Sequence, residues 1–339
     1  MSDHPFTFDD YPEQRPRKGR RPVRTVLLVM LSLVLVAALA AGGYLWNLAR
    51  TFDSGKQVIA NALPADKPEK SEAAKDSQNI LLIGSDSRDP AAGDAQSDTM
   101  MLLHIPGDRH GIYVTSIMRD TWVDIPGYGE HKINAASAFG GIQLSVATVQ
   151  SLFDIPIDHV AVIDFEGFKG LTEALGGVTV NNEVAFQSEG AQGEYFDAGP
   201  IRIEGDSALK YVRERYAFTD GDYQRVKNQQ AFLSGLISGI LARDTLTNPV
   251  RINNMVGEIS PYLRVDEELD AAAVGSLGLS LRSVRSADVH MFTLPNAGIG
   301  TSADGQSIII PDTGAIADMG AALDADDVAG YLDTIEERN

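Results

Sequence analysis

The sequence predicts an α/β protein: a three-layer α/β/α sandwich with a mixed central sheet, preceded by one transmembrane helix. Short apolar runs are typical of buried strands, and segments with helical periodicity lie between and after them, as in a layered α/β domain. A long uncharged stretch precedes both. The strand-like runs are residues 80–83, 100–105, 112–117 and 160–163, and the helical patterns are residues 141–153, 168–175, 207–216 and 223–242.

The N-terminal part predicts a membrane anchor. Residues 1–24 form a basic tail whose Lys and Arg cluster between Arg15 and Arg24, and residues 25–49 carry no charge. An apolar helix of about 20 residues crosses a bilayer, and basic clusters stay on the cytoplasmic side. We therefore expect a single-pass cell-membrane protein with a cytoplasmic N-terminus, a linker over residues 50–78 and an extracytoplasmic domain. A cleaved signal peptide is the alternative, and it also exports the domain.

The composition of the chain excludes or disfavours several classes of function. The chain of 339 residues has a formal net charge of -19, which disfavours nucleic acid as a partner and requires any anion site to concentrate its bases. It contains no cysteine, which excludes disulfides, thiolate metal sites and a cysteine nucleophile. P-loop, hydrolase-elbow and zincin motifs are also absent.

The main domain is expected over residues 79–312. Beyond Pro249 the pattern is helical to about residue 284, and late strands are expected at residues 289–294 and 307–310. Residues 313–339 are rich in Asp and Ala, which indicates an acidic tail with one marginal helix at most.

Two carboxylates suggest a metal site. Asp86 and Arg88 follow the first apolar strand directly, and Asp98 opens the next one. Ligands gather at the carboxyl ends of strands in open α/β sheets, and Mg²⁺ takes one or two carboxylates together with phosphate oxygens and water. Mn²⁺ is also possible. The alternative is that Asp and Ser simply make turns at these positions.

Arginines suggest an anion site. Arg119 and Asp120 end an otherwise apolar strand, and Lys132 adds a further donor after a glycine-rich turn. A denser cluster consists of Arg213, Arg215, Asp222, Arg225 and Gln229, in which positions 222, 225 and 229 share one helical face. The guanidinium fork fits phosphate oxygens, although a solvated, salt-bridged helix would give the same pattern.

Phe232, Leu236 and Ile240 form an apolar stripe on the same helical segment. Such a stripe is more often part of a core than of a lipid groove.

Together these segments resemble the LytR-CpsA-Psr family of cell-envelope glycopolymer transferases, over about residues 79–242 with a looser match to residue 312. The resemblance rests on six motifs in one order. They are Leu82-Ile83-Gly84-Ser85-Asp86-Ser87-Arg88, Ser97-Asp98-Thr99-Met100-Met101-Leu102, Arg119-Asp120, Lys132-Ile133-Asn134-Ala135, Arg213-Glu214-Arg215-Tyr216, and Asp222 through Arg225 to Gln229-Gln230.

The resemblance implies that the domain binds a polyprenyl-pyrophosphate-linked glycan, with the lipid in an apolar pocket. It implies transfer of a glycan phosphate to a peptidoglycan hydroxyl, for a polymer of the wall teichoic acid, arabinogalactan or capsule type. A lipid pyrophosphatase and a non-catalytic binding module remain alternatives. The implied metal ligands are Asp86 and Asp98, and the implied pyrophosphate ligands are Arg88, Arg119, Arg213, Arg215, Arg225 and Gln229, with Asp222 orienting them and Lys132 nearby.

The catalytic assignments that follow are Arg119, Arg215 and either Asp86 or Asp120 as the base. Two positions depart from the family pattern. Gln96 stands where many members carry Arg, which predicts a missing or weaker phosphate contact, and Met118 stands where many have Pro.

Overall fold

The computed structural model describes residues 21–85, 97–190 and 193–336. Its contacts divide the chain into two units, Met1–Asn47 and Leu48–Asn339, of which the second contains the sheet. Helix α1 (Arg21–Gly55) covers the whole uncharged stretch, so the helix predicted there is observed. Within the part of the chain that is described, no helix is long and apolar enough to cross a membrane.

A seven-stranded mixed sheet forms the centre of the second unit, in agreement with the predicted fold class. The neighbours β1–β12, β7–β2 and β4–β13 are parallel, and the other three pairs are antiparallel. In spatial order the strands are β1 (Gln57–Val58), β12 (Leu263–Val265), β7 (His159–Asp164), β2 (Gln78–Ser85), β3 (Ser97–Ile105), β4 (Ile112–Ile117) and β13 (Val289–Thr293).

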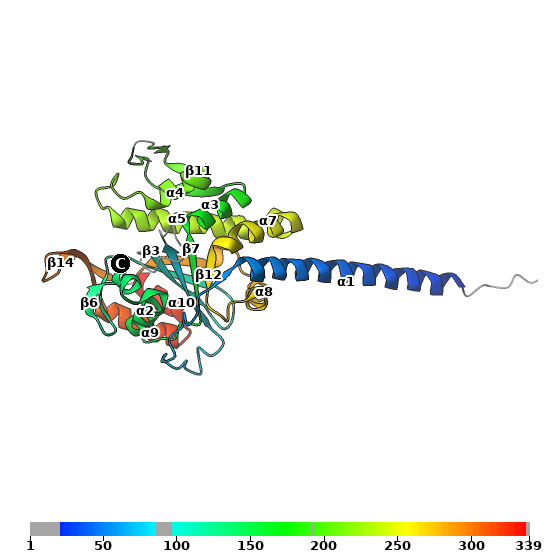
Figure 1. Ribbon diagram of the computed structural model, residues 1–339, viewed down its shortest axis with the longest axis horizontal. Coiled ribbons are helices and arrows are strands. Elements are labelled where there is room, and N and C mark those ends of the chain that lie inside the picture. The colour runs from blue at the N-terminus through cyan, green and yellow to red at the C-terminus, as the bar shows by residue number, and fades with distance from the viewer. Residues whose placement is uncertain (1–20, 86–96, 191–192, 337–339) are drawn as a thin grey trace, which may run out of the picture. The chain divides into compact units, whose positions relative to one another are not determined.

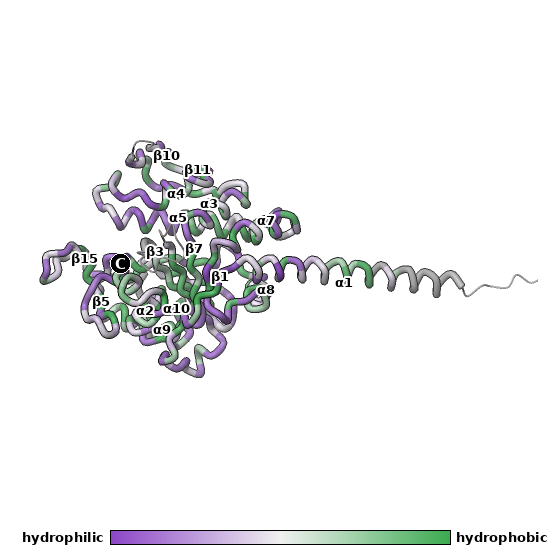
Figure 2. Tube along the Cα trace, in the orientation of Figure 1, coloured by the Kyte–Doolittle hydropathy of each residue, from purple (hydrophilic) through white to green (hydrophobic). Residues whose placement is uncertain are grey.

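Helices cover both faces of this sheet (Figure 1). On one face α2, α9 and α10 pack on a core that includes Leu81 and Ile83, and on the other α5 packs near Ile80 and Leu82. Successive strand residues face opposite sides, so β2 supplies both cores. Figure 2 shows hydrophobic residues concentrated on the central strands. The helices are α2 (Ala135–Phe153), α3 (Phe165–Ala174), α4 (Gly205–Arg213), α5 (Asp222–Leu241), α6 (Arg243–Leu246), α7 (Pro249–Ile259), α8 (Ala271–Ser280), α9 (Thr313–Asp324) and α10 (Val328–Glu336).

The described residues also form four small two-stranded sheets. Only one of their strands, β15, was predicted from the sequence. Their strands are short and partly exposed, so their apolar runs are too brief to stand out in the sequence. The pairs are β5 (Trp122–Ile125) with β6 (Gly129–Lys132), β8 (Val178–Asn182) with β11 (Gly199–Ile203), β9 (Phe186–Gln187) with β10 (Tyr195–Phe196), and β14 (Asn296–Thr301) with β15 (Ser307–Pro311).

The ends of the domain differ from the prediction. Residues 313–339 were expected to be an acidic tail, yet α9 and α10 pack on the sheet through Ile316, Met319, Leu323 and Val328. Their many small residues hide this apolar stripe in the sequence. The expected linker at residues 50–78 likewise contributes strand β1 to the edge of the sheet. The helical pattern beyond Pro249 is interrupted by strand β12.

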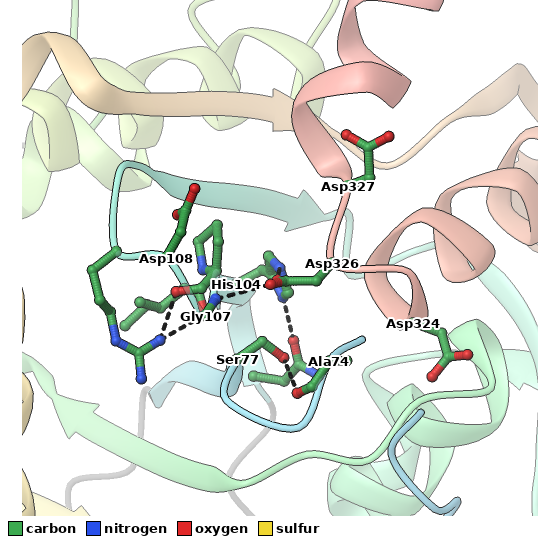
Figure 3. A network of polar contacts seen from close by, with 12 residues as sticks. Ala74, Ser77, His104, Gly107, Asp108, Asp324, Asp326 and Asp327 are labelled. Atoms are coloured by element: carbon green, nitrogen blue, oxygen red, sulfur yellow. Dashed lines mark hydrogen bonds and ion pairs between the residues drawn. The ribbon is translucent and has the colours of Figure 1, made fainter. Parts of the chain in front are cut away.

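A buried polar network ties the segment between α9 and α10 to the sheet (Figure 3). His104 of β3 lies 2.7 Å from Asn79 Oδ1 through Nδ1 and 3.1 Å from Asp326 Oδ1 through Nε2. The other carboxylate oxygen of Asp326 accepts a hydrogen bond from the Gly107 amide at 2.9 Å. Burial raises the pKa of Asp326, but the bonds from His104 and Gly107 outweigh it and hold that pKa below its usual value.

Candidate functional site

A cavity of about 500 Å³ lies between the sheet and the helices α3, α4, α5 and α7. Its walls are mostly apolar. Strands β2, β7 and β12 contribute Leu82, Ala161 and Leu263, and the helices contribute Phe168, Phe232 and Leu236. The Phe168 and Phe232 rings lie 4.8 Å apart between centroids. The cavity therefore offers an apolar surface suited to a long hydrocarbon chain.

The predicted apolar stripe of α5 contributes to this cavity in part. Phe232 and Leu236 line it, whereas Ile240, one turn further on, packs instead against the neighbouring hydrophobic cluster. Asp164 and Phe165 also line the cavity, although the sequence analysis did not select them. Their position at the carboxyl end of β7, where ligands gather in α/β sheets, was the signal that could have found them.

Cationic side chains from three parts of the chain line the same cavity. Arg119 follows β4, Arg213 and Arg215 lie at the end of α4, and Arg225 lies in the first turns of α5. Gln229, one turn after Arg225, donates hydrogen bonds to Thr99 Oγ1 at 3.0 Å and to the Val212 carbonyl at 3.2 Å. The structure thus brings together five of the predicted anion ligands.

Asp222 lies between three of these arginines. Its Oδ2 is 3.2 Å from Arg225 Nη2 and 3.6 Å from Arg119 Nε, and its Oδ1 is 3.7 Å from Arg215 Nη1. Among the described residues, the buried Oδ1 accepts no hydrogen bond. One carboxylate therefore holds three arginines in place, and the cluster keeps a net positive charge.

The local sequence positions the arginine loop. Buried Glu214 accepts hydrogen bonds from the amides of Arg215, Tyr216 and Ala217 at 2.8–3.1 Å, which fixes the chain where α4 ends. Arg215 also donates to the Tyr216 hydroxyl, and its guanidinium lies 4.4 Å from the centre of that ring. The hydrogen bond to Tyr216 raises the pKa of Arg215, with Asp222 adding to the effect and burial opposing it.

The predicted base candidate Asp120 lies beside this cluster. Its carboxylate is 3.9 Å from Arg119 Nε and 3.0 Å from Lys132 Nζ. Lys132 therefore neutralises Asp120. The Lys132 side chain itself is not among those that line the cavity. Because Lys132 offsets its charge, Asp120 lies next to the arginines without lowering the net positive charge of the region.

The predicted metal ligands lie largely outside the described residues. This applies to Asp86 and to the side chain of Asp98, and also to the predicted pyrophosphate ligand Arg88 and to Gln96. Asp98 belongs to β3, whose Ser97 pairs with Ser85, the residue before Asp86. Within the part of the chain that was searched, no group of three or more His, Asp or Glu side chains could hold a metal ion.

Fold and site together define an α/β protein whose apolar cavity is lined in part by arginines, an arrangement suited to an amphiphile with an anionic head group. The LytR_cpsA_psr family model matches residues 48–325 of the chain. The chain belongs to this family, as the sequence motifs predicted.

Two curated relatives align with most of the chain. The chain is 31% identical over 256 residues to a protein of Enterococcus faecalis named polyisoprenyl-teichoic acid–peptidoglycan teichoic acid transferase TagU, covering 75% of this chain and 81% of that protein. It is 37% identical over 255 residues to the TagU of Halalkalibacterium halodurans, covering 71% and 79%.

Solved structures share the fold. Bacillus subtilis TagV superposes with a TM-score of 0.66 at 23% identity, covering 75% of this chain and 98% of that one. A structure described as TagT bound to LI-WTA superposes with a TM-score of 0.60 at 25% identity, covering 78% and 98%.

Proposed function

We propose that the domain transfers a glycan phosphate from a polyprenyl-pyrophosphate carrier to a hydroxyl of peptidoglycan. The proposal rests on one cavity, whose walls are mostly apolar and which is also lined by Arg119, Arg213, Arg215 and Arg225. A polyprenyl pyrophosphate has the same two parts in the same order. The names of the curated TagU relatives, which describe this reaction type for teichoic acid, add support.

The apolar part of the cavity would bind the polyprenyl chain. Each buried methylene group contributes about 0.8 kcal/mol, so a few isoprene units bind strongly without a specific polar contact. Strand and helix residues such as Leu82 and Phe232 form these walls and keep the chain away from water. The lipid would thereby fix where its pyrophosphate lies.

The arginines would hold the two phosphates. They remain charged at any physiological pH, and their rigid donors bind phosphate oxygens in pairs. Asp222 lies between the three arginines and offsets part of the repulsion among their positive charges. The cluster would stabilise charge that develops on the leaving polyprenyl phosphate.

In the reaction, the acceptor hydroxyl oxygen bonds to the glycan-linked phosphorus, and the bridging P–O bond to the lipid phosphate breaks. The products are a glycan phosphodiester and polyprenyl phosphate, and the hydroxyl proton passes to a carboxylate. Asp120, 3.0 Å from Lys132 and beside Arg119, is one candidate for that carboxylate, and Asp86 is the other.

Magnesium bound by Asp86 and Asp98 is part of the proposal and rests on the sequence. The pairing of Ser85 with Ser97 is compatible with it, because each of these residues precedes one of the two aspartates. When bound, the ion would neutralise charge on the pyrophosphate oxygens.

Membrane attachment through residues 25–49 is likewise proposed from the sequence. It would present the domain to both a lipid-linked donor and the wall. Fractionation of cells that carry the full chain tests it, because release of the protein by salt or alkaline washing would contradict an integral anchor.

The transfer reaction is tested with the full chain in detergent, a polyprenyl-pyrophosphate glycan, a soluble peptidoglycan fragment and Mg²⁺. Mass spectrometry should find glycan joined to the fragment through phosphate, and chelation or Arg119→Ala should remove this product. Free glycan phosphate without the joined product would favour a pyrophosphatase. Donor that is bound but intact would favour a binding module, and either result would refute transfer.

A further inference from the structure

A row of aromatic side chains, two exposed and two half-buried, lies on the β5–β6 hairpin and the first turn of α2. It consists of Trp122, Tyr128, His131 and Phe139, which we call the aromatic platform. The Tyr128 and Phe139 rings are stacked at 4.8 Å with planes 15° apart, and His131 meets Phe139 edge-on at 5.0 Å. Trp122 continues the row, 6.2 Å from His131.

The hairpin does not need the rings of the aromatic platform in order to attach to the domain. Val123 and Ile125 of the same hairpin are buried in the main core and attach it to the domain. By contrast, Tyr128 is 51% exposed and Phe139 is 39% exposed. Contiguous exposed aromatic surface is costly in water and commonly marks a binding site.

The backbone holds the platform in shape. Gly127 and Gly129 flank Tyr128 with φ values of 82° and 79°, a conformation that favours glycine. After Phe139, Gly140 and Gly141 leave helical geometry and interrupt α2, so Phe139 ends a separate first turn. The Tyr128 hydroxyl donates a hydrogen bond to the Phe139 carbonyl at 3.3 Å, which joins the two pieces.

The base of the hairpin is continuous with the arginine site. Trp122 pairs with Lys132 across the hairpin, and Lys132 lies 3.0 Å from Asp120, the residue beside Arg119. The Asn134 amide also donates a hydrogen bond to the Arg119 carbonyl at 3.2 Å. A strand of four residues is about 13 Å long, so the platform begins at the base candidate and extends away from it.

Polar groups accompany the aromatic rings. Asp124 and Glu130 are exposed, pair with each other across the hairpin and lie on the same face of it as Trp122. The combination of flat apolar rings with hydrogen-bond acceptors suits a pyranose sugar. Such a ring has an apolar C–H face that packs on an aromatic side chain and a rim of hydroxyl and amide donors.

We propose that the aromatic platform binds sugar rings of the acceptor glycan and directs its hydroxyl toward Asp120 and the arginines. This inference rests on the proposed transfer reaction, because it assigns the second substrate of the same site. The acceptor is favoured over the donor glycan because the platform starts at the carboxylate that would receive the acceptor proton.

A binding experiment tests the platform without the reaction. The chain has two tryptophans, so Trp46→Phe leaves Trp122 as the single reporter. Titration of this full-length variant with a soluble β-1,4-linked N-acetylhexosamine tetrasaccharide should shift the Trp122 fluorescence saturably. Adding Tyr128→Ala should weaken the binding about five- to tenfold, as expected for loss of one stacked ring.

Kinetics with donor and acceptor varied separately complete the test. Tyr128→Ala should raise the KM for the acceptor about five- to tenfold and leave the KM for the donor unchanged. Tyr128→Phe keeps the ring and loses only the hydrogen bond to the Phe139 carbonyl, so its acceptor KM should lie closer to that of the wild type than that of Tyr128→Ala. Tyr195→Ala is the matched control, because Tyr195 is 59% exposed on a different hairpin.

Absence of a fluorescence shift, an effect on donor KM alone, or a dimer that Tyr128→Ala disrupts would each overturn the platform assignment. If the wild type transferred glycan while Tyr128→Ala and Phe139→Ala kept the acceptor KM, the platform would be refuted and the transfer reaction would stand. Saturable sugar binding by a chain that performs no transfer would refute the reaction instead.

Discussion

Two partly buried aspartates occupy opposite kinds of environment in this domain. Asp326 has both carboxylate oxygens engaged, one by His104 at 3.1 Å and the other by the Gly107 amide at 2.9 Å (Figure 3). Asp222 lies 3.2–3.7 Å from three arginines, and its Oδ1 accepts no hydrogen bond from any described residue.

The difference separates a structural polar network from a binding site. Around Asp326 donors and acceptors are matched, so a ligand has nothing to add there. Among the described residues around Asp222, the cations outnumber the carboxylate, so a further negative charge would be attracted to the cluster. A folded domain tolerates that imbalance when binding an anion is its function, and the predictions below test this distinction.

The largest effect is expected from the arginines. Arg119→Ala or Arg215→Ala should lower the transfer rate at least about 10³-fold, because preorganised charge at a transferring phosphate is lost. The melting temperature should stay near that of the wild type, since like charges are removed. Arg251→Ala is the control, because Arg251 forms a surface ion pair with Asp244. Turnover at the wild-type rate in either variant would remove that residue from the site.

Blocking the cavity should have the next largest effect. Ala161→Phe places a ring into the space between β7 and the helices and displaces several methylene groups of the lipid. At about 0.8 kcal/mol for each group, activity with a long-chain donor should fall roughly a hundredfold. A donor with a very short lipid should lose much less. Equal loss for both donors would argue against lipid binding in this cavity.

The structural network should affect stability instead of activity. His104→Ala removes a side chain that is 1% exposed, and with it the contacts that His104 makes to Asn79 Oδ1 and Asp326 Oδ1. We expect the free energy of unfolding in urea to fall by about 2–4 kcal/mol. The kcat of the folded fraction should be unchanged. His110→Ala, at an exposed histidine, is the control, and a loss of kcat without a loss of stability would contradict the structural role.

The smallest expected effect is on the pH dependence of the domain's stability. The pKa of Asp326 is lowered in the folded domain because hydrogen bonds from His104 and Gly107 outweigh burial. Its contribution to stability is therefore complete above its unfolded pKa of about 3.9 and is lost as the pH falls through the lower folded value.

The variant Asp326→Asn suits this test, because Asn also tolerates the positive φ of 55° at that position. Thermal melts between neutral and acidic pH should show the gap between wild type and variant closing as the pH falls below about 4. A gap that stays constant over this range would show that the charge of Asp326 contributes nothing.

The sequence predicted the strands and the arginine cluster because each has a strong local signal. Four apolar runs became β2, β3, β4 and β7, and the arginines near positions 213–225 stand out in an acidic chain. Their convergence with Arg119 on Asp222 could not be predicted, because it depends on a contact more than a hundred residues apart in sequence. The family motifs supplied that link.

Other features escaped prediction for physical reasons. The helices α9 and α10 are rich in small residues, so their contribution to the core is weak in the pattern. The cavity wall depends on single residues from separated strands, such as Ala161 and Leu263, which no local motif marks. The aromatic platform is likewise formed by rings from a hairpin and a helix that only the fold brings together.

The central claim is that one site binds the lipid in the cavity and its pyrophosphate at the arginines. The most direct measurement is photo-crosslinking with a polyprenyl pyrophosphate that carries a diazirine in its tail, followed by peptide mapping. We predict labelling of α3 and α5 near Phe168, Phe232 and Leu236, competed by unlabelled lipid pyrophosphate and lost in Ala161→Phe. Labelling confined to exposed apolar residues elsewhere, such as Leu279, would contradict the account.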